Sequence, residues 1–361
     1  MNDPVQKIRV AVICGGTSNE RNVSLKSGIQ ILKHLDATRY EPKLVEIAAN
    51  GQWFLKDTAT LLQIDVTQPA EKGIVPAQPS SLQEWPEKPF DVAFISLHGS
   101  FGEDGRIQAL LDLLQIPYTG SGVLASALCM NKMQARDVVS GLDIKVPSGF
   151  LLHKRNLPPH HIIENRVKNE IGFPCIVKPN ASGSSIGISL VRTKEALAQA
   201  MAHSFEEDDS AIVEQYIQGR EITCGVMGNA SIGGELMVLP PVEIIPDGDF
   251  FDYRAKYDSA LTKEICPALL EQGLMEEVKN YAVKIHERMG CDGLSRSDFI
   301  LRDSSFYFLE TNTIPGLTEK SLCPKEAAAT GITFGDFFGK QIELALEKNY
   351  GTRYSTRDPH E

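Results

Sequence analysis

The sequence lacks the features that mark membrane-spanning, secreted and nucleic-acid-binding proteins. It contains no apolar run of about 18 residues that could cross a membrane. The N-terminal segment has no apolar stretch long enough for a signal peptide, and neither repeats nor low-complexity tracts are present. The net charge of −11 provides no general basic surface, so neither nucleic acid nor an anionic membrane is expected as a partner.

The seven cysteines are too scattered to form a disulfide framework or a zinc site. They occupy positions 14, 129, 175, 224, 266, 291 and 323, without a C-x-x-C pair and mostly within apolar runs. Buried reduced thiols are therefore expected, and with them a reducing, cytoplasmic environment. The chain has 361 residues, 42% of them hydrophobic and 23% charged, which is enough for two or three globular domains.

Two segments in the first third of the chain have the pattern of α/β units. Residues 8–14 form an apolar run that ends at a glycine pair, and a helix is predicted to start near residues 22–24. A second strand is predicted at 92–97. Open α/β sheets bind ligands at the carboxyl ends of such strands. There Glu20 is either a helix-cap carboxylate or a ligand for a substrate ammonium group, and His98 is either structural or functional.

A loop rich in glycine and serine in the middle of the chain is the next informative segment. Predicted strands at 175–179 and 187–191 flank it. Its backbone N–H groups and hydroxyls, together with the charge of Lys178, suit a polyphosphate. The alternative is a hairpin tip without a ligand. A further strand is predicted at 211–217, and residues 249–267 are predicted to form a long loop of the kind that covers active sites.

The last informative segment is a predicted β-hairpin with its turn at Ser304. Counting outward from this turn places Asp298 opposite Glu310 and Arg296 opposite Asn312. All four side chains then share one face, because side chains alternate along a strand. Two opposed carboxylates repel each other, and two acids with an amide suit a hard cation such as Mg²⁺. The alternative is a solvated face that tolerates the repulsion.

Several longer motifs occur along the chain from about Ile8 to Leu346. They are GGTSNERNVSL, LHGSFGEDG, PYTGSG followed by MNK, IVKPNASGSSIG, EQYIQGRE, FFDYRAKY, SRSDF and ETNTIPGLTEKSL. In this order the motifs resemble those of the D-alanine–D-alanine ligase family of ATP-grasp enzymes. One departure is Ser297, which stands where an apolar residue is commoner in the family and is expected to face away from the metal.

The resemblance implies an α/β ATP-grasp fold of three domains, with the nucleotide held between the central and C-terminal ones. The expected ranges are 1–131 for a Rossmann-like N-terminal domain, 132–220 for the central domain and 221–361 for the C-terminal domain. The implied cofactors are ATP and Mg²⁺, with two metal ions expected and Mn²⁺ as a substitute. The implied partners are ATP and D-alanine, and the family suggests a homodimer.

The resemblance also implies roles for individual residues. Those expected to contact the nucleotide are Lys132, Lys178, Ser185, Glu214, Gln215, Tyr216, Ile217, Glu221 and Lys256. The expected metal ligands are Asp298, Glu310 and Asn312. The expected catalytic residues are Glu20, Ser184, Tyr257, Arg296 and Gly316, of which the last two would stabilise the oxyanion of a tetrahedral intermediate. The residues expected to bind the amino-acid substrates are His98, Ser321 and Leu322.

The implied reaction is the ATP-dependent ligation of two D-alanine molecules into D-alanyl-D-alanine for peptidoglycan synthesis. It would pass through a D-alanyl phosphate and release ADP and phosphate. The nearest alternative is a relative that accepts D-lactate or D-serine second, although the pair Lys256-Tyr257 matches the dipeptide-forming enzymes. A catalytically silent nucleotide-binding protein would have lost one of the four hairpin residues, and all are present. The motif GGTSNERNVSL argues against an ATP-grasp ligase for other carboxylates.

Overall fold

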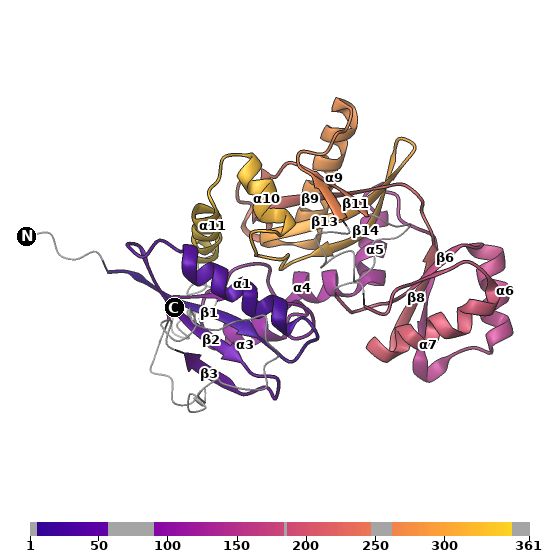
Figure 1. Ribbon diagram of the computed structural model, residues 1–361, viewed down its shortest axis with the longest axis horizontal. Helices are drawn as coiled ribbons and strands as arrows, with labels where there is room; N and C mark the ends of the chain where they lie inside the picture. The colour runs from indigo at the N-terminus through magenta and orange to yellow at the C-terminus, as the bar shows by residue number, and fades with distance from the viewer. Residues whose placement is uncertain (1–5, 57–89, 184–185, 247–261, 349–361) are drawn as a thin grey trace, which may run out of the picture.

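The computed structural model describes residues 6–56, 90–183, 186–246 and 262–348, which form three sheets with helices packed on them. Figure 1 shows the three sheets as separate layers, with the second one in a lobe that stands apart from the other two. One sheet falls within each of the ranges 1–131, 132–220 and 221–361, except that the first strand of the third sheet begins at Arg220. The domain boundaries themselves stay a prediction.

The first sheet is the α/β layer predicted from the N-terminal third. Its strands, in the spatial order β3-β2-β1-β4, are β1 (Ile8–Gly15), β2 (Tyr40–Ile47), β3 (Trp53–Lys56) and β4 (Val92–Ile95). β1 pairs in parallel with β2 and β4, and its apolar run is buried, as the central strand of a covered parallel sheet requires. The helices that follow are α1 (Arg21–His34), α3 (Arg106–Leu113) and α4 (Val123–Met130).

The second sheet is antiparallel and belongs to the small lobe. Its strands, in the order β5-β8-β6-β7, are β5 (Gly149–His153), β8 (Ser210–Gln215), β6 (Cys175–Pro179) and β7 (Ser189–Val191). The helices α6 (His160–Glu170) and α7 (Leu197–Glu207) share its apolar core. Short 3-10 turns lie at Lys154–Asn156 and Lys194–Ala196. The predicted hairpin of β6 and β7 is confirmed.

The third sheet carries the last hairpin. Its strands, in the order β12-β11-β9-β13-β14, are β12 (Thr262–Ile265), β11 (Val242–Pro246), β9 (Arg220–Asn229), β13 (Asp292–Arg302) and β14 (Ser305–Asn312), with β10 (Met237–Val238) on β9. A 3-10 turn at Ala230–Ile232 follows β9. The prediction of one loop over 249–267 is wrong at its end, because β12 extends the sheet there by pairing with β11.

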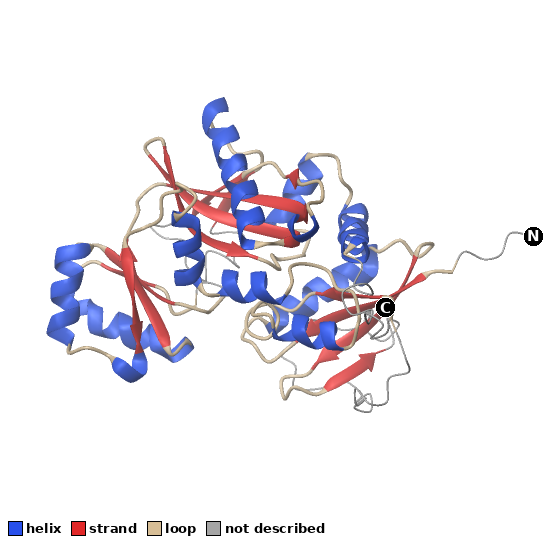
Figure 2. Cartoon of the chain, turned by 180° about the vertical axis from the view of Figure 1, so that it is seen from behind, coloured by secondary structure: helices blue, strands red, loops and turns tan. Residues whose placement is uncertain are grey.

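Helices cover the third sheet and join it to its neighbours. They are α5 (Lys132–Ser140), α9 (Gln272–Met289), α10 (Leu322–Ala329) and α11 (Phe334–Glu347). α9 crosses the face of the sheet that Figure 2 presents. α5 also packs in that core although it precedes the second sheet in the chain. α11 shares a core with the first sheet and with β13, so it connects these two layers.

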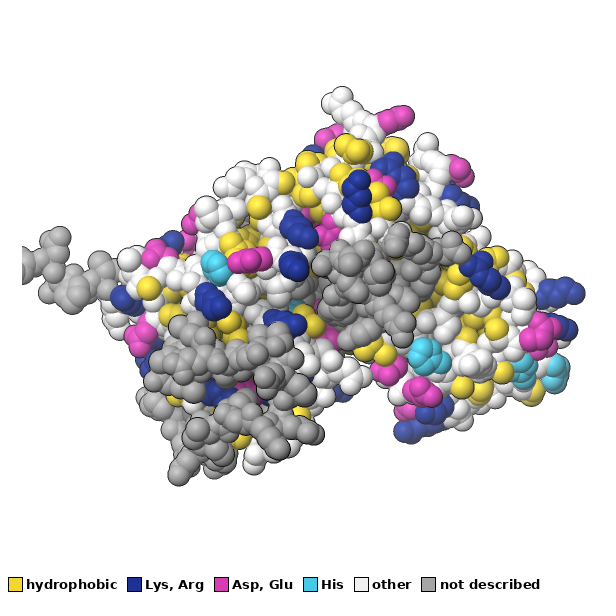
Figure 3. Space-filling view, viewed as in Figure 1, with side chains coloured by type: hydrophobic (Ala, Val, Ile, Leu, Met, Phe, Trp, Pro, Cys, Tyr) yellow, Lys and Arg dark blue, Asp and Glu magenta, His cyan; other side chains and the backbone are white. Residues whose placement is uncertain are grey.

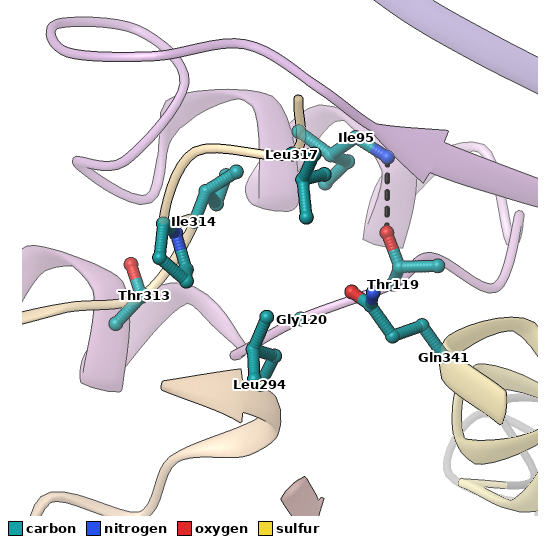
Figure 4. Close-up of a pocket in the computed structure, with 9 residues that line it drawn as sticks. Ile95, Thr119, Gly120, Leu294, Thr313, Ile314, Leu317 and Gln341 are labelled. Carbon is teal, nitrogen blue, oxygen red and sulfur yellow. Dashed lines mark hydrogen bonds between the residues drawn. The ribbon is translucent and has the colours of Figure 1, made fainter. Parts of the chain in front are cut away.

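The first and third sheets meet at a cavity of about 10 Å³, room for roughly one water molecule. Figure 4 shows Ile95 of the first sheet and Leu294 of β13 on its walls, with Gln341 of α11 closing one side. Thr119 accepts a hydrogen bond from the Ile95 backbone at 3.0 Å. The wall also includes Ile314, which follows β14, so the end of the hairpin is packed directly against the first layer.

The hairpin has the predicted register at the functional positions, but for a reason that counting did not anticipate. Arg296 pairs with Asn312 and Asp298 with Glu310, as predicted. The turn, however, takes two residues, Asp303-Ser304, rather than being centred on Ser304. A bulge at Leu309 restores the expected pairs by adding one residue to β14. It also places Leu309 and Glu310 on the same side, where both line one cavity.

The remaining expectations concern the state of the cysteines, the possibility of membrane-spanning helices and the charge of the surface. All seven cysteines lie in the described residues as free thiols, six of them buried, which confirms the prediction from their spacing. Over the described residues, every helix is too short or too polar to cross a bilayer. Acidic and basic side chains are interspersed on the face shown in Figure 3.

Candidate functional site

A cavity of about 330 Å³ lies between the second and third sheets. Eight residues predicted to bind nucleotide or metal line it: Lys132, Lys178, Gln215, Tyr216, Ile217, Glu221, Asp298 and Glu310. They come from α5, from β6, from the end of β8 and the segment after it, and from β9, β13 and β14. Residues separated by more than 170 positions in the chain are therefore gathered around one space.

The cationic end of the cavity is built around Lys132, the first residue of α5. Its ammonium donates to the carbonyl of Ser182 at 2.6 Å and lies 3.2 Å from Oε2 of Glu310. Asn131 caps the helix by accepting from the Gln134 backbone. Lys132 thus contacts both the glycine- and serine-rich loop and the hairpin. A side chain that binds phosphates next to a metal site would need this position.

Lys178 and Glu214 form a buried ion pair across two neighbouring strands. Lys178 points from β6, and its ammonium lies 2.6 Å from Oε1 of Glu214 on β8. Both side chains are more than nine-tenths buried. A buried charge needs a partner of opposite sign. In this pair each residue is the partner of the other.

The three predicted metal ligands lie together at the hairpin. The Asn312 amide donates to Oδ2 of Asp298 at 3.1 Å, and Glu310 is directly opposite Asp298 in the ladder. Two carboxylates and an amide oxygen are the hard donors that Mg²⁺ prefers. Among the described residues no cluster of three or more acidic, histidine or cysteine side chains is placed to hold a metal, so a site here depends on Asn312.

Asp298 is the most heavily hydrogen-bonded of these ligands. Its Oδ1 accepts from Thr223 at 2.5 Å and from Nε of Arg296 at 2.8 Å. Its Oδ2 accepts from Nη2 of Arg296 at 2.7 Å and from Asn312. These four bonds use the roughly four lone-pair positions of a carboxylate. The donor set therefore fits a metal ion, but an ion that binds Asp298 must replace one of these donors.

Arg296 is held between two buried acids. Burial acts to lower its pKa, but the charge and hydrogen bonds of Asp298 outweigh burial and raise the pKa of Arg296 well above its ordinary value. On the other side lies Glu326 of α10, which is completely buried. Burial raises the pKa of the Glu326 carboxyl to about 8, against the opposing charge of Arg296. Arg296 is consequently a permanent cation in a fixed position.

Glu20 lies where the first layer meets the glycine- and serine-rich loop. A Cβ at Gly99 would come within 2.5 Å of Oε2 of Glu20, and a Cβ at Gly183 would overlap the same oxygen. A side chain at either glycine would therefore push the carboxylate out of the position that it has here. Glu20 also occupies the N-cap position of α1, but its side chain makes no capping hydrogen bond. The helix-cap interpretation, which was the simpler one from sequence, is wrong.

His98 is buried, and both of its ring nitrogens have partners. Nδ1 lies 3.0 Å from the carbonyl of Ile314, and Nε2 lies 3.3 Å from Oγ of Ser27. Because a carbonyl can only accept, Nδ1 carries a proton and donates it to Ile314, so Nε2 of the neutral ring accepts from the serine. The histidine therefore holds the segment that leads to Gly316 against the first layer.

Gly316 and Ser321 lie side by side at the start of α10. A Cβ at Gly316 would approach Oγ of Ser321 to 2.7 Å, which explains the absence of a side chain. Ser321 is the N-cap residue, and its hydroxyl lies 3.1 Å from the Thr318 backbone nitrogen and 2.9 Å from the Thr318 hydroxyl. Leu322 is the first residue of the helix. Free N–H groups at a helix start suit a carboxylate.

Comparison with known proteins identifies the family of this chain. The family model for the N-terminus of D-ala D-ala ligases matches residues 9–121, and the model for their C-terminus matches residues 138–343. This chain belongs to the D-alanine–D-alanine ligase family. A relative named D-alanine–D-alanine ligase, from Desulfotalea psychrophila, is 40% identical over 353 residues, covering 96% of this chain and 98% of the relative.

Solved structures of the family have the same fold. The crystal structure of the VanG D-Ala:D-Ser ligase from Enterococcus faecalis superposes with a TM-score of 0.80 at 31% identity, covering 94% of this chain and 100% of that one. A D-alanine–D-alanine ligase from Bacillus anthracis, solved in complex with ATP, gives a TM-score of 0.72 at 29% identity, covering 94% and 98% of the two chains. The predicted ATP-grasp fold is confirmed.

Four residues assigned by resemblance to the ligases lie outside the described residues. They are Ser184, Ser185, Lys256 and Tyr257. Their roles remain predictions.

Sequence reasoning missed the apolar walls of the ligase cavity. Most of these side chains are isoleucine or leucine: Ile176, Ile188, Ile244, Ile300 and Leu309. Apolar walls with a few polar groups are typical of sites for flat organic ligands such as a purine. Two of them could have been found from the sequence. Ile176 and Ile300 lie two residues from Lys178 and Asp298, and residues two apart on a strand share one face.

Proposed function

We propose that this protein joins two molecules of D-alanine to D-alanyl-D-alanine with the hydrolysis of ATP to ADP and phosphate. Membership of the ligase family supports the reaction class. The observation that carries the proposal for this chain is the position of Lys132. Its ammonium bridges the glycine- and serine-rich loop and the carboxylate of Glu310 at the end of an apolar-walled cavity.

In the first step, a carboxylate oxygen of the first D-alanine attacks the γ-phosphorus of ATP and ADP leaves. The product is an acyl phosphate. Negative charge grows on the transferred group and the leaving oxygen, and catalysis consists of positioning and neutralising that charge. Lys132 and Lys178 are the proposed contacts to the phosphates, and Glu20 is the proposed contact to the ammonium group of the substrate. Lys256 and Tyr257 belong to the proposal on resemblance alone.

In the second step, the amine of the second D-alanine attacks the acyl carbon and phosphate leaves. The tetrahedral intermediate carries an oxyanion that needs fixed donors. Arg296 is such a donor because Asp298 holds its guanidinium and keeps it charged. The backbone N–H of Gly316 is the second proposed donor. The start of α10, at Ser321 and Leu322, is the proposed site for the carboxylate of the second substrate.

We infer that Asp298, Glu310 and Asn312 hold Mg²⁺, with two ions expected and Mn²⁺ as a substitute. When bound, the metal supplies positive charge to the nucleotide phosphates. Around it, Asn312 keeps one amide N–H on Asp298, which leaves its oxygen for another partner. Because Lys132 contacts Glu310, a metal bound there would share this carboxylate with the lysine. Removal of divalent cations with EDTA should abolish phosphate release, and added Mg²⁺ should restore it.

The deciding experiment measures ATP-dependent phosphate release with D-alanine alone and then with D-serine or D-lactate added, with products identified by mass. Release with D-alanine alone and a D-alanyl-D-alanine product are expected. A mixed D-Ala–D-Ser product would identify the specificity named for the VanG ligase, to which this chain is 31% identical, and an ester product would identify a ligase that accepts D-lactate. Absence of release with every pair would contradict the proposed activity.

The proposal extends to the organisation of the protein. We infer three domains at 1–131, 132–220 and 221–361, a homodimer and a cytoplasmic location. The end of one family match at residue 121 and the start of the other at residue 138 support a boundary near 131. Sedimentation equilibrium would test the homodimer, and a mass of one chain would contradict it.

A further inference from the structure

Arg136 is a buried cation that has no place in the reaction described so far. It lies on α5, and its side chain is behind the wall of the nucleotide cavity rather than on it. Nη1 donates to the carbonyl of Pro147 at 3.1 Å, and Nη2 donates to the carbonyl of Gly149 at 3.1 Å. Pro147 lines the cavity. The guanidinium is thus fixed directly behind the nucleotide site.

The two carbonyls belong to a different layer from the helix that carries Arg136. α5 packs in the core of the third sheet, through Ala135 and Val139, whereas Gly149 begins β5 of the second sheet. The nucleotide cavity lies between these same two sheets. In Figure 1, α5 lies at the junction between the small lobe and the rest of the molecule. Arg136 therefore ties together the two layers that enclose the nucleotide site.

The charge of Arg136 also reaches the ion pair of Lys178, which lines the cavity, with Glu214, which does not. Its Nη1 lies 3.9 Å from Oε2 of Glu214, and Oε1 of the same carboxylate takes the 2.6 Å contact from Lys178. Gly149 is directly opposite Glu214 in the ladder, where a Cβ would lie 2.7 Å from the glutamate Cβ. The absence of that side chain lets β5 approach β8 closely. One buried carboxylate consequently has two cationic neighbours.

The two cations differ in how freely they can move. Lys178 ends in a flexible chain whose three donors can be redirected, while the planar guanidinium of Arg136 is held by two carbonyls and cannot lose its proton. If Lys178 turns toward a nucleotide phosphate, Glu214 would lose its nearest partner. A buried carboxylate without a counter-ion is strongly unfavourable. Arg136 remains beside Glu214 whatever Lys178 does.

We propose that Arg136 is a positioning residue of the nucleotide site: it is the fixed counter-ion of Glu214, and it frees Lys178 to bind the nucleotide phosphates. The inference rests on the proposed function for the identity of the nucleotide. It concerns binding of ATP and not the chemistry of the amino acids.

The first test measures the affinity for Mg·ATP by isothermal titration calorimetry without D-alanine, so that no turnover occurs. In Arg136→Met the dissociation constant should rise by at least about tenfold, because one partner of a buried charge cluster is gone. In steady-state assays the KM for ATP should rise likewise, with kcat at saturating ATP and the KM for D-alanine changed by less than about threefold. An unchanged affinity for Mg·ATP would overturn the proposal.

Arg136→Met also removes the donors to two carbonyls, so its effect must be separated from a loss of stability. Arg166→Met is the matched control, because Arg166 is exposed on α6 of the same lobe and its guanidinium lies over Phe150, 3.9 Å from the ring centroid. Ile163→Ala, in the buried core of that lobe, is a destabilised control. Both controls should bind Mg·ATP as the wild type does. A loss of affinity in Ile163→Ala equal to that in Arg136→Met would overturn the proposal.

Two further variants distinguish a counter-ion from a simple tie between layers. Arg136→Lys keeps the charge but cannot bond both carbonyls, and its affinity should lie closer to the wild type than that of Arg136→Met. In a Glu214→Gln background the carboxylate is absent, so adding Arg136→Met should change the affinity by less than about twofold. A full Arg136→Met effect in that background, or Arg136→Lys as weak as Arg136→Met, would overturn the proposal.

The calorimetric readout keeps this inference separate from the proposed reaction. A wild-type protein that binds Mg·ATP but forms no dipeptide would contradict the reaction, while the Arg136 variants would still decide the inference. A wild-type protein that fails to bind Mg·ATP would overturn both.

Discussion

The two halves of the site are built by different means. In the nucleotide half, charged side chains stand on strands and are paired either across neighbouring strands, as Lys178 is with Glu214, or along one strand, as Arg296 is with Asp298. In the amino-acid half, the functional groups lie on loops and helix starts, and glycines let segments approach. The Glu20 carboxylate lies directly against Gly99 and Gly183, where an added side chain would displace it.

This difference predicts how each half responds to change. Paired charges on strands keep their geometry as long as each partner remains, so loss of one partner has a large and local effect. Contacts between loops depend on how the layers sit against one another, so a single added methyl group is enough to disturb them. The predictions below test this contrast, from the largest expected effect to the smallest.

The largest effect is expected for Asp298→Asn. The change removes one of the two carboxylates proposed to hold the Mg²⁺ that would neutralise charge on the phosphates, a contribution worth several kcal/mol. Phosphate release with ATP and D-alanine should fall by roughly 10³-fold, with the circular dichroism spectrum retained. Asp303→Asn is the control on the same hairpin, because Asp303 has a positive φ of 50° at the turn, which asparagine tolerates. Equal losses in both variants would contradict the role of Asp298.

A smaller effect is expected for Gly183→Ala, a substitution in the amino-acid half of the site. The new methyl group would collide with Oε2 of Glu20, so the KM for the first D-alanine should rise by about 10- to 100-fold. Gly273→Ala is the matched control, since a Cβ at that position meets no atom within 4 Å and the backbone is in an ordinary conformation. A KM for D-alanine equal to that of the wild type would contradict this prediction and show that the amino-acid half tolerates the methyl group.

A pH-dependent effect on stability is expected at Glu326, the buried acid beside Arg296. Burial raises its folded pKa to about 8, above the ordinary value of 4.5, so its contribution to the free energy of unfolding is fully present below pH 4.5 and declines as the pH rises toward 8. The wild type should therefore lose stability relative to Glu326→Gln between pH 5 and pH 8, by something on the order of 2 kcal/mol. Thermal unfolding of both proteins at several pH values measures this, and parallel curves would refute it.

The smallest effect is expected for Ser297→Ala. Ser297 lies opposite Thr311, and their hydroxyls are 3.0 Å apart in the buried interior, away from the cavity. Loss of this hydrogen bond should lower the free energy of unfolding by about 1 kcal/mol and leave ligase activity unchanged. The measurement is urea unfolding together with phosphate release, and a large loss of activity would mean that this position belongs to the site after all.

Much of the nucleotide half could be predicted because its order is local. Alternation along β13 and β14 correctly placed Arg296, Asp298, Glu310 and Asn312 on one face. Yet the turn was misplaced, and only the bulge at Leu309 brought the predicted pairs about. Without that bulge, Glu310 would follow Phe308 into the apolar core by simple alternation. A bulge depends on packing against the neighbouring layers, which short-range periodicity does not report.

Other features were beyond the reach of sequence patterns. β12 is short and lies beside a segment of mixed charge, and it becomes a strand because β11 offers an edge. The second neighbour of Glu214 comes from α5, 78 positions earlier in the chain, and His98 finds its carbonyl partner 216 positions away. Each of these contacts forms only when separate layers pack together.

The sequence by itself determined which residues share a strand face, where the glycine-rich turns fall, and that the chain has the motifs of a D-alanine–D-alanine ligase. These properties follow from backbone geometry and from side chains a few residues apart. Only the tertiary structure decided which buried charges are paired, that Glu20 lies against Gly183, and that Arg136 stands behind Lys178. A buried charge is stabilised by the partner atoms that tertiary packing places next to it, and this packing depends on the whole chain.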